Sequence, residues 1–419
     1  MNGKIIKEVV EYFYPILIII LLLLFKILSF TNFILGYLVY CSIIYLTTKT
    51  YLFYIKNEFN QDLLDNCPSI KYPNFKQYFL LPFTFGQFIL LQISSSPKKS
   101  NQNIIFEEEK VDDEGTSIFW ASFENSKNIH FNPILFILPG ITGKYNDSYV
   151  KNIISEGLEN NFDVVVFQMR TLSSEMKMPK NGNFVNFYED INNSLIKIRN
   201  KNNNIIFGVG YSYGANLLTG YLGTKNLETN FIQGGIALSN PFDLYISQRI
   251  GKDTLFESLI TSFERNKYLD AVNSVNKESQ NNKNYINVDI LLSNYYVKNF
   301  DAEFFGKILG YKNGDEYYRG ISSAKYIKYI NKPLLVIHSK DDPICTYKGI
   351  PFDDVCENEN IIFILTDKGG HSCFIENDKY FSFSPIQWMF KPTFEFVNYL
   401  KNKIQNNVNI LMFDNIEKI

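Results

Sequence analysis

Six short runs of Val, Ile, Leu and Phe recur along the chain, each bounded by polar or turn-forming residues. The runs are Pro133–Leu138, Phe162–Phe167, Ile205–Val209, Phe231–Leu238, Pro333–Ile337 and Ile361–Leu365. Runs without polar alternation are typical of strands that are buried on both faces of a parallel sheet. Amphipathic stretches of helical length separate most of them, namely Asp147–Asn160, Asn186–Arg199 and Tyr213–Leu222. This alternation predicts an α/β protein with a mostly parallel, doubly wound sheet.

Two segments outside the alternation predict a hairpin and an insertion. Ile104–Phe106 and Ile118–Phe123 flank Asp113-Glu114-Gly115, a turn signal that predicts a β-hairpin. Pro241–Ile330 contains no clear buried strand and is too long for a simple connection in a compact domain. We expect it to form a helical cap over the edge of the sheet at which the strands end, because open α/β folds bind their ligands there.

The N-terminal segment has the longest apolar region of the chain. Phe13–Phe25 carries no charge, and after Lys26 the run Ile27–Leu46 continues with few polar interruptions. Such a length predicts a membrane anchor, either one long tilted helix or two short ones. Lys4 and Lys7 also suit a signal peptide, but the apolar region is too long for one and no small-residue cleavage site follows. Positive charges on both flanks leave the orientation open. The chain then divides into an anchor (1–56), a first core part (57–240), the helical cap (241–330) and a second core part (331–419).

Composition and charge exclude several classes of function. The chain has 419 residues and a formal net charge of −2, which gives no basic surface for nucleic acid. Hydrophobic residues make up 46% and aromatic residues 16%, which predicts a well-filled core. The five cysteines contain no C-x-x-C pair, so we expect neither a zinc site nor a disulfide scaffold. No cofactor-binding motif is present, and the segment Gly140 to Lys144 lacks the spacing of a phosphate loop.

A G-x-S-x-G pattern follows the third buried run. Gly210-Tyr211-Ser212-Tyr213-Gly214 lies directly after Ile205–Val209 and before the helix-forming stretch Ala215–Leu222. A nucleophile elbow needs this strand–turn–helix context, because its glycines permit a tight turn and the helix N-terminus favours developing negative charge. The alternative is a small-residue turn that only packs the strand against the helix. The pattern makes Ser212 the candidate nucleophile.

A nucleophilic serine needs a base, and the chain has only three histidines to supply one. His371 follows the last buried run, in a loop that begins Lys368-Gly369-Gly370. His130 lies ahead of an early strand, and His338 closes the fifth run as a strand-end residue near the site. His371 is therefore the candidate base.

The base in turn needs a carboxylate that fixes its tautomer and stabilises the imidazolium. Asp341-Asp342-Pro343 follows the fifth buried run, at the same edge of the predicted sheet. We favour Asp342, which lies where the loop turns back, and Asp341 is the alternative. The chain order Ser212, Asp342, His371 is that of an α/β-hydrolase.

The oxyanion of an acyl-transfer reaction needs donors that are already in place. The segment Leu138-Pro139-Gly140-Ile141-Thr142-Gly143 follows the first buried run. The backbone N–H of Ile141 and that of Tyr213, the residue after the candidate nucleophile, are the expected oxyanion hole.

Together these residues resemble a known group, the membrane-anchored α/β-hydrolase-domain family that includes the bacterial YheT-type esterases and the eukaryotic hydrolases grouped with them. The likeness covers about residues 65–400 and rests on motifs from the core, the cap and the last loop. These motifs are Cys67-Pro68, Pro139-Gly140-Ile141-Thr142-Gly143, Gly210-Tyr211-Ser212-Tyr213-Gly214-Ala215-Asn216, Tyr221-Leu222-Gly223, Ser239-Asn240-Pro241-Phe242-Asp243-Leu244, Phe300-Asp301, Gly310-Tyr311, Glu316-Tyr317-Tyr318, Asp341-Asp342-Pro343 and Gly369-Gly370-His371. The chain departs from the family at Arg170-Thr171, where Arg-Gly is usual, and at Ser372-Cys373-Phe374, where Ile-Gly-Phe is usual.

The resemblance implies an α/β-hydrolase fold and a serine hydrolase that acts on carboxylic esters, with acylglycerols and phospholipids as substrates. It places nucleophile, acid and base on Ser212, Asp342 and His371. It also implies a membrane location, such as the endoplasmic reticulum, with the side of the catalytic domain left open. Two alternatives remain. The same acyl-enzyme could pass its acyl group to an alcohol, or the fold could serve as a non-catalytic binding protein.

Overall fold

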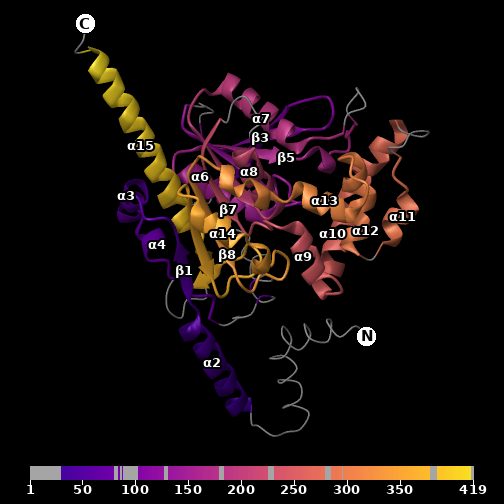
Figure 1. Cartoon of the computed structure of the whole chain (residues 1–419), viewed down its shortest axis with the longest axis horizontal. Coiled ribbons are helices and arrows are strands. Elements are labelled where there is room, and N and C mark those ends of the chain that lie inside the picture. The colour runs from indigo at the N-terminus through magenta and orange to yellow at the C-terminus, as the bar shows by residue number, and fades with distance from the viewer. Residues whose placement is uncertain are drawn as a thin grey trace.

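The predicted buried strands lie side by side in the central sheet of the computed structural model (Figure 1). The structure describes residues 30–79, 84, 87, 102–126, 131–178, 184–224, 231–278, 285–294, 296–377 and 385–416. The strands of the sheet are β1 Thr50–Phe53, β2 Ile104–Lys110, β3 Ser117–Phe123, β4 Ile134–Leu138, β5 Asp163–Gln168, β6 Ile206–Tyr211, β7 Ile232–Leu238, β8 Leu334–Ser339 and β9 Ile361–Thr366. Within the described ranges their order is β1-β9-β8-β7-β6-β4-β5-β3-β2.

Most neighbours in this sheet are parallel. The strands from β9 to β5 pair in parallel, whereas β1 pairs antiparallel with β9, and β3 pairs antiparallel with both β5 and β2. Each of the six apolar runs forms one of the parallel strands, so the prediction of a mostly parallel α/β sheet is confirmed. The hairpin is confirmed as well, with Ile104 opposite Phe123 and Lys110 opposite Ser117. The edge strand β1 was not predicted.

Helices cover both faces of the sheet. They are α2 Phe30–Thr47, α3 Glu58–Asn66, α4 Pro68–Lys71, α6 Ser148–Glu159, α7 Phe187–Lys201, α8 Tyr213–Gly223, α9 Leu244–Gly251, α10 Leu255–Glu278, α11 Val288–Ser293, α12 Val297–Asp301, α13 Gly314–Ile321, α14 Phe352–Glu357 and α15 Phe390–Ile416. Helices α7 and α8 pack in one core, and α3, α4, α6 and α15 pack in the other. A small second sheet pairs β10 Ile375–Asn377 with β11 Pro385–Gln387.

Strand β4 shows how one apolar run serves two cores. Ile134, Phe136 and Leu138 pack with α7 and α8, whereas Leu135 and Ile137 pack with α6 and α15. Successive side chains of a strand point to opposite faces, so a strand that is covered on both sides must be apolar at every position.

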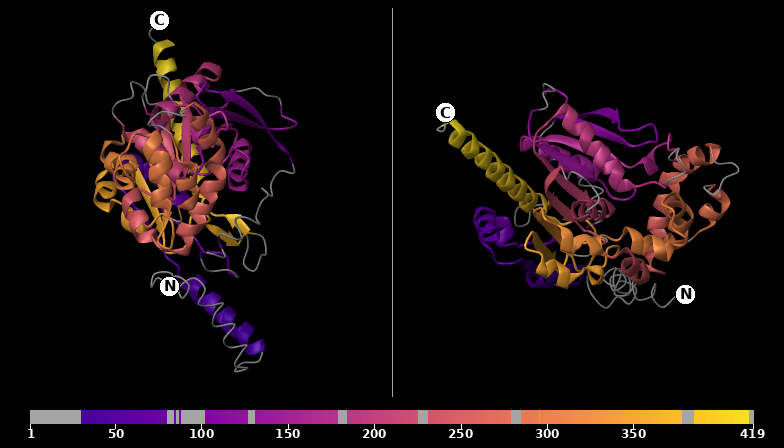
Figure 2. Two further views of the ribbon diagram at one scale, coloured as in Figure 1. Left: turned by 90° about the vertical axis from the view of Figure 1, so that its right-hand side faces the viewer. Right: turned by 45° about the horizontal axis from the view of Figure 1, so that its top comes forward.

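The stretch between β7 and β8 is helical, as predicted for the cap. It contains α9 to α13 and, between α12 and α13, a π-helical turn at Ala302–Gly306. In Figure 1 and in the right view of Figure 2, α10 to α13 lie on the side of the molecule opposite α15. This arrangement places the insertion at one end of the sheet and leaves the α6–α15 face uncovered by it.

At the N-terminal end, the apolar run Phe13–Phe25 lies outside the described residues. Helix α2 covers most of the second apolar run, Ile27–Leu46. Within the part of the chain that the structure describes, no helix has both the length and the apolar character needed to cross a membrane.

A buried arginine joins three segments beside the sheet. Arg170 follows β5 and is 4% exposed. Its guanidinium donates from Nε to Asp190 Oδ2 at 2.8 Å, from Nη1 to Glu114 Oε2 at 2.6 Å and from Nη2 to Asp112 Oδ2 at 3.2 Å. Burial raises the pKa of Asp190 to about 6, although the Arg170 charge acts in the opposite direction. The arginine therefore ties helix α7 and the β2–β3 turn to the end of β5.

Replacing this arginine should destabilise the fold strongly. We expect Arg170→Met to lower the free energy of unfolding by about 3–5 kcal/mol, because it leaves the buried Asp190 carboxylate without its cation. Denaturant unfolding measures the change, and the double variant Arg170→Met/Asp190→Leu should recover part of the loss. A loss no larger than that of Lys110→Met, which breaks only the exposed pair with Glu175, would contradict this account.

Candidate active site

Ser212 lies in a sharp turn between β6 and α8. Its backbone has φ 52° and ψ −118°, a left-handed conformation that costs a side-chain-bearing residue free energy. The Ser212 N–H donates to Leu238 O at 2.8 Å, which fixes the turn against the end of β7. Helix α8 begins at Tyr213, so the serine lies at its N-terminal end.

Two glycines make this turn possible. A Cβ atom on Gly210 would lie 2.5 Å from the Ala215 Cα, and one on Gly214 would lie 2.1 Å from the Leu138 carbonyl oxygen. Neither position has room for a side chain. The G-x-S-x-G pattern is therefore a steric requirement of the turn in this chain.

His371 lies on a loop whose backbone is held at several points. Gly370 and Ser372 have φ of 61° and 56°, so residues on both sides of the histidine are left-handed. Ser339 Oγ donates to Gly370 O at 2.8 Å, and the Ser372 N–H donates to Ser239 Oγ at 2.9 Å. These bonds connect the loop after β9 to the ends of β8 and β7.

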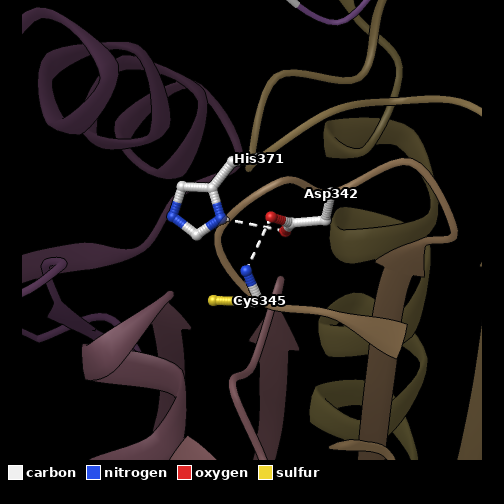
Figure 3. A group of neighbouring side chains, drawn as sticks. All are labelled: Asp342, Cys345 and His371. Carbon is white, nitrogen blue, oxygen red and sulfur yellow. Dashed lines mark hydrogen bonds and ion pairs between the residues drawn. The ribbon is translucent and has the colours of Figure 1, made fainter. Parts of the chain in front are cut away.

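The imidazole of His371 contacts Asp342, as Figure 3 shows. His371 Nδ1 lies 2.9 Å from Asp342 Oδ2, and the Asp342 side chain is fully buried. The other carboxylate oxygen, Oδ1, accepts the N–H groups of Ile344 at 2.9 Å and Cys345 at 2.8 Å. The two amides hold the carboxylate in place, so its free oxygen faces the histidine ring.

Asp341, the alternative in the sequence, points elsewhere. Its Oδ1 accepts the Gly370 N–H at 2.9 Å and its Oδ2 accepts the Thr84 hydroxyl at 2.9 Å. Burial raises the pKa of Asp341, while the Lys368 charge lowers it. In this geometry Asp342 contacts the imidazole, and Asp341 contacts the backbone that carries it.

The remaining described histidine supports the same loop. His338 is completely buried, and its Nε2 lies 2.8 Å from Cys345 O. Because a carbonyl only accepts, this nitrogen carries the proton. Burial lowers the pKa of His338, which favours the neutral ring. His130 lies outside the described residues.

The expected oxyanion donors, Ile141 and Tyr213, line the same pocket as Ser212. Their backbone N–H groups donate to no other residue in the described part of the chain. The preceding Gly140 N–H donates to the Tyr149 hydroxyl at 3.0 Å, which fixes the start of the segment. Both free amides therefore remain available to an oxygen beside Ser212.

Cys345 is a close neighbour of Ser212 that the sequence did not single out. Its Sγ lies 4.0 Å from Ser212 Oγ, and burial raises the pKa of its thiol well above the usual value.

No hydrogen bond joins the described side chains of Ser212 and His371. Catalytic hydrogen bonds are often long in structures without substrate and tighten when it binds.

Ligand atoms of Asp342, Cys345 and His371 lie within 4.8 Å of one another, a spacing that could hold a metal ion. However, the Asp342 carboxylate and His371 Nδ1 already contact each other. A metal ion at this point would have to break that contact and remove the proton from a buried thiol.

The cap supplies further residues that sequence reasoning missed. The Tyr268 hydroxyl on α10 donates to the Ile141 carbonyl, so the cap touches the oxyanion segment directly. Glu264 lies one helical turn before Tyr268 and faces Asp301, which accepts the Tyr318 hydroxyl at 2.7 Å. Asp301 and Tyr318 belong to the motifs of the resemblance, but nothing in the sequence indicated that they meet Glu264.

A comparison with known families decides the identity of the fold. The sequence profile described as alpha/beta hydrolase fold matches residues 133–378, which is more than half of the chain. The chain belongs to this family. The order of Ser212, Asp342 and His371 in this α/β hydrolase, each after a strand of the parallel sheet, is the order typical of the fold.

Three curated proteins illustrate what this α/β hydrolase is similar to. It is 28% identical to the "Embryogenesis-associated protein EMB8" of Picea glauca over 59% of this chain and 54% of that protein. It is 33% identical to a "Monoacylglycerol lipase" of Saccharomyces cerevisiae over 57% of this chain and 54% of that protein. It is 26% identical to "Phospholipase ABHD3" of Homo sapiens over 82% of this chain and 84% of that protein. The chain thus spans about half the length of the first two relatives. The narrower resemblance, to the membrane-anchored YheT-type group, stays a prediction.

The buried acids of the cap should make the stability of this α/β hydrolase depend on pH. Burial raises the pKa of Asp301 from 3.8 to about 7 and that of Glu264 well above its usual value. Between about pH 4 and 7 the folded chain then binds more protons than the unfolded chain, so this contribution to stability is lost as pH rises through the window. Each pKa unit corresponds to about 1.4 kcal/mol.

We expect Asp301→Asn to remove the part of this pH dependence that comes from Asp301. Relative to the variant, the wild type should lose on the order of 2 kcal/mol of unfolding free energy between pH 5 and pH 8. Urea unfolding at the two pH values measures the difference, with Asp289→Asn, an exposed acid of α11, as the control. Parallel pH profiles of wild type and Asp301→Asn would contradict the assignment.

Proposed function

We propose that the chain is a serine hydrolase of carboxylic esters. The observation that carries the proposal is the contact of 2.9 Å between His371 Nδ1 and Asp342 Oδ2, next to Cys345, whose Sγ lies 4.0 Å from Ser212 Oγ. The carboxylate fixes the imidazole so that Nδ1 carries the proton and Nε2 can accept the proton of the serine. The family to which the chain belongs and the names of its relatives support the same reaction.

The proposed reaction runs through an acyl-enzyme. Ser212 Oγ attacks the ester carbonyl carbon, and His371 takes the hydroxyl proton. When the carbon–oxygen bond to the alcohol breaks, His371 returns that proton to the leaving oxygen. Water then attacks the acyl-serine, His371 accepts a proton from the water, and the acid leaves as His371 passes that proton to Ser212 Oγ.

The backbone amides of Ile141 and Tyr213 are the proposed oxyanion hole. A free N–H at each position, together with the helix N-terminus at Tyr213, would stabilise the negative charge on the tetrahedral oxygen. This stabilisation is strong because the donors are already in place and need no reorganisation during the reaction.

Lipid esters are the substrates that we propose. The pocket beside Ser212 includes apolar side chains such as Ile141, Leu244 and Ile344, which suit an acyl chain. Relatives named monoacylglycerol lipase and phospholipase support this class. The apolar run Phe13–Phe25 supports the membrane anchor that we propose for residues 1–56, which would bring the site to substrates that partition into a bilayer.

Kinetics with a soluble p-nitrophenyl ester test the proposed residues. Ser212→Ala and His371→Ala should each lower kcat by about 10³-fold or more, because the nucleophile or its base is lost.

The two neighbouring aspartates give a matched pair of variants for the same kinetic assay. Asp342→Asn should lower kcat by about 10³–10⁴-fold, because the imidazole loses the carboxylate that fixes its tautomer. Asp341→Asn keeps an acceptor for the Gly370 N–H and should cost about tenfold or less.

A different pattern would refute the assignment. Equal losses of kcat in Asp341→Asn and Asp342→Asn would show that Asp342 is not the carboxylate that fixes the imidazole. Full activity in Ser212→Ala would show that another group attacks the ester.

Tyr268 should act as a positioning residue for the oxyanion hole. Tyr268→Phe removes the hydroxyl that donates to Ile141 O, so the Ile141 N–H is held less firmly. Loss of a whole oxyanion donor costs about 10²–10³-fold in rate. Because Tyr268→Phe keeps the Ile141 N–H but holds it less firmly, we expect the variant to lower kcat by about tenfold with little change in KM. Tyr285→Phe, at an exposed tyrosine of the cap, is the control. A change in KM alone would point to substrate binding instead.

A further inference from the structure

The pocket beside Ser212 contains the proposed oxyanion donors but not the proposed base. It encloses about 700 Å³, including space that is open to solvent, and Ile141 and Tyr213 line it together with Ser212. His371 does not line it. The leaving alcohol must lie within reach of this histidine, because the imidazole returns the proton to it. The pocket therefore suits the acyl chain of the ester, with the alcohol on the side of the histidine.

One face of helix α9 forms a wall of this pocket. Its lining residues are Leu244, Ser247, Gln248 and Gly251, a spacing of three and four residues that places all of them on the same side of the helix. At about 1.5 Å per residue, the wall runs for about 10 Å from Leu244 to Gly251. A Cβ atom at position 251 would therefore point toward the pocket.

Gly251 lies at the end of the pocket away from the oxyanion segment. Its carbonyl accepts the Thr254 hydroxyl at 2.6 Å and the Thr254 N–H at 3.2 Å, which fixes the turn into α10. Thr254 and Glu257 line the pocket at this turn. About 16 Å of helix, at about 1.5 Å per residue, then separate Glu257 from Tyr268, whose hydroxyl donates to Ile141 O. The pocket is thus lined by α9 and α10 from the oxyanion segment to the turn that joins them.

The far end of the pocket suits a hydrocarbon chain. Ile260 and Val297 add apolar side chains to its lining. The polar groups at this end are already bonded within the cap, because the Glu257 carboxyl accepts the Asp253 N–H at 2.5 Å and bonds to the Val297 backbone. An apolar chain that extends this far would leave none of these bonds unmade.

Neither packing nor backbone geometry requires a glycine at position 251. A Cβ atom there would meet no described atom of another part of the chain within 4 Å, whereas one on Gly214 would lie 2.1 Å from the Leu138 carbonyl oxygen. Glycines that end helices are usually left-handed, but Gly251 does not have a positive φ. Alanine would also be the better helix former. The missing side chain instead leaves open space on the pocket face of α9.

We propose that Gly251 determines how long an acyl chain the pocket accepts, because its missing side chain keeps the far end of the pocket open to the distal methylene groups. The inference rests on the proposed esterase function and deepens it, since it names the residue that selects among acyl chains.

A side chain at position 251 would take the space of those distal methylene groups. Each methylene group that an apolar site buries contributes about fourfold to kcat/KM. A short acyl chain ends before Gly251 and gains nothing from the open space. The balance between long and short acyl chains should therefore change when this position is filled.

Four p-nitrophenyl esters test the position, namely those of butanoic, hexanoic, octanoic and decanoic acid, each below its micellar concentration. Release of p-nitrophenol gives kcat/KM for every ester, and the value for butanoate is the reference for each protein. We expect Gly251→Leu to lower the ratio of kcat/KM for decanoate to that for butanoate by about tenfold or more, because leucine displaces more than one methylene group. Gly251→Ala should lower the same ratio by about two- to fourfold.

Two controls separate chain length from general damage. Gly36→Leu adds the same side chain at a helical glycine of α2 that also has open space around it and does not line the pocket, so its ratio should equal that of the wild type. Ethyl butanoate and decyl butanoate vary the alcohol at a constant acyl chain, and release of butanoate measures both. Their ratio should not change in Gly251→Leu, because the alcohol lies on the side of His371.

Each outcome separates this inference from the proposed reaction. An unchanged ratio of decanoate to butanoate in folded Gly251→Leu would overturn the inference and keep the esterase. A loss that follows the length of the alcohol would overturn the assignment of the pocket to the acyl chain. Hydrolysis of none of the esters by the folded wild type would overturn both. Thermal unfolding shows whether each variant is folded, and Gly251→Ala, which favours the helix, decides the question if Gly251→Leu is not.

Discussion

The left-handed backbone of Ser212 is the constraint on which the rest of the site depends. A side chain at positive φ is unfavourable, so this turn persists only because its surroundings leave no alternative. Strand β6, helix α8 and the end of β4 approach so closely that neither Gly210 nor Gly214 could carry a Cβ atom. Serines after β7 and β9, Ser239 and Ser372, are also left-handed and hydrogen-bonded to each other. The parallel sheet thus holds several strained loop ends together at one edge, beside the serine.

The helical cap is hydrogen-bonded to the core at this edge of the sheet. Asn216, on the first turn of α8, donates to Ile321 O and accepts the Ser323 N–H, both at 2.8 Å, so the helix after Ser212 is bonded to the end of the cap. On the other side, Tyr268 of α10 reaches the Ile141 carbonyl. The cap helices therefore restrain both segments that we propose to form the oxyanion hole. The same helices carry residues that line the pocket beside Ser212, among them Ile260 and Val297.

The sequence predicts those parts of the molecule in which local pattern and burial agree. The six buried strands are visible because both faces of each strand are covered, which forces uninterrupted apolar runs. Strand β1 was missed because its four residues are only half-buried and lie at the sheet edge. The choice between Asp341 and Asp342 depends on contacts with a loop about 30 residues away, which no local pattern contains. Glu257 and Glu264 look like the polar face of a surface helix, and only the fold shows that both are buried and that Glu264 meets Asp301.

The central claim is that Ser212 is an activated nucleophile beside His371. The most direct measurement is mass spectrometry of the folded chain after reaction with a fluorophosphonate, which phosphonylates only a serine that a base has activated. The account predicts one phosphonyl group per chain, on the peptide that contains Ser212, and none in His371→Ala. A folded wild-type chain that gains no phosphonyl group, or gains it on a different residue, would contradict the account.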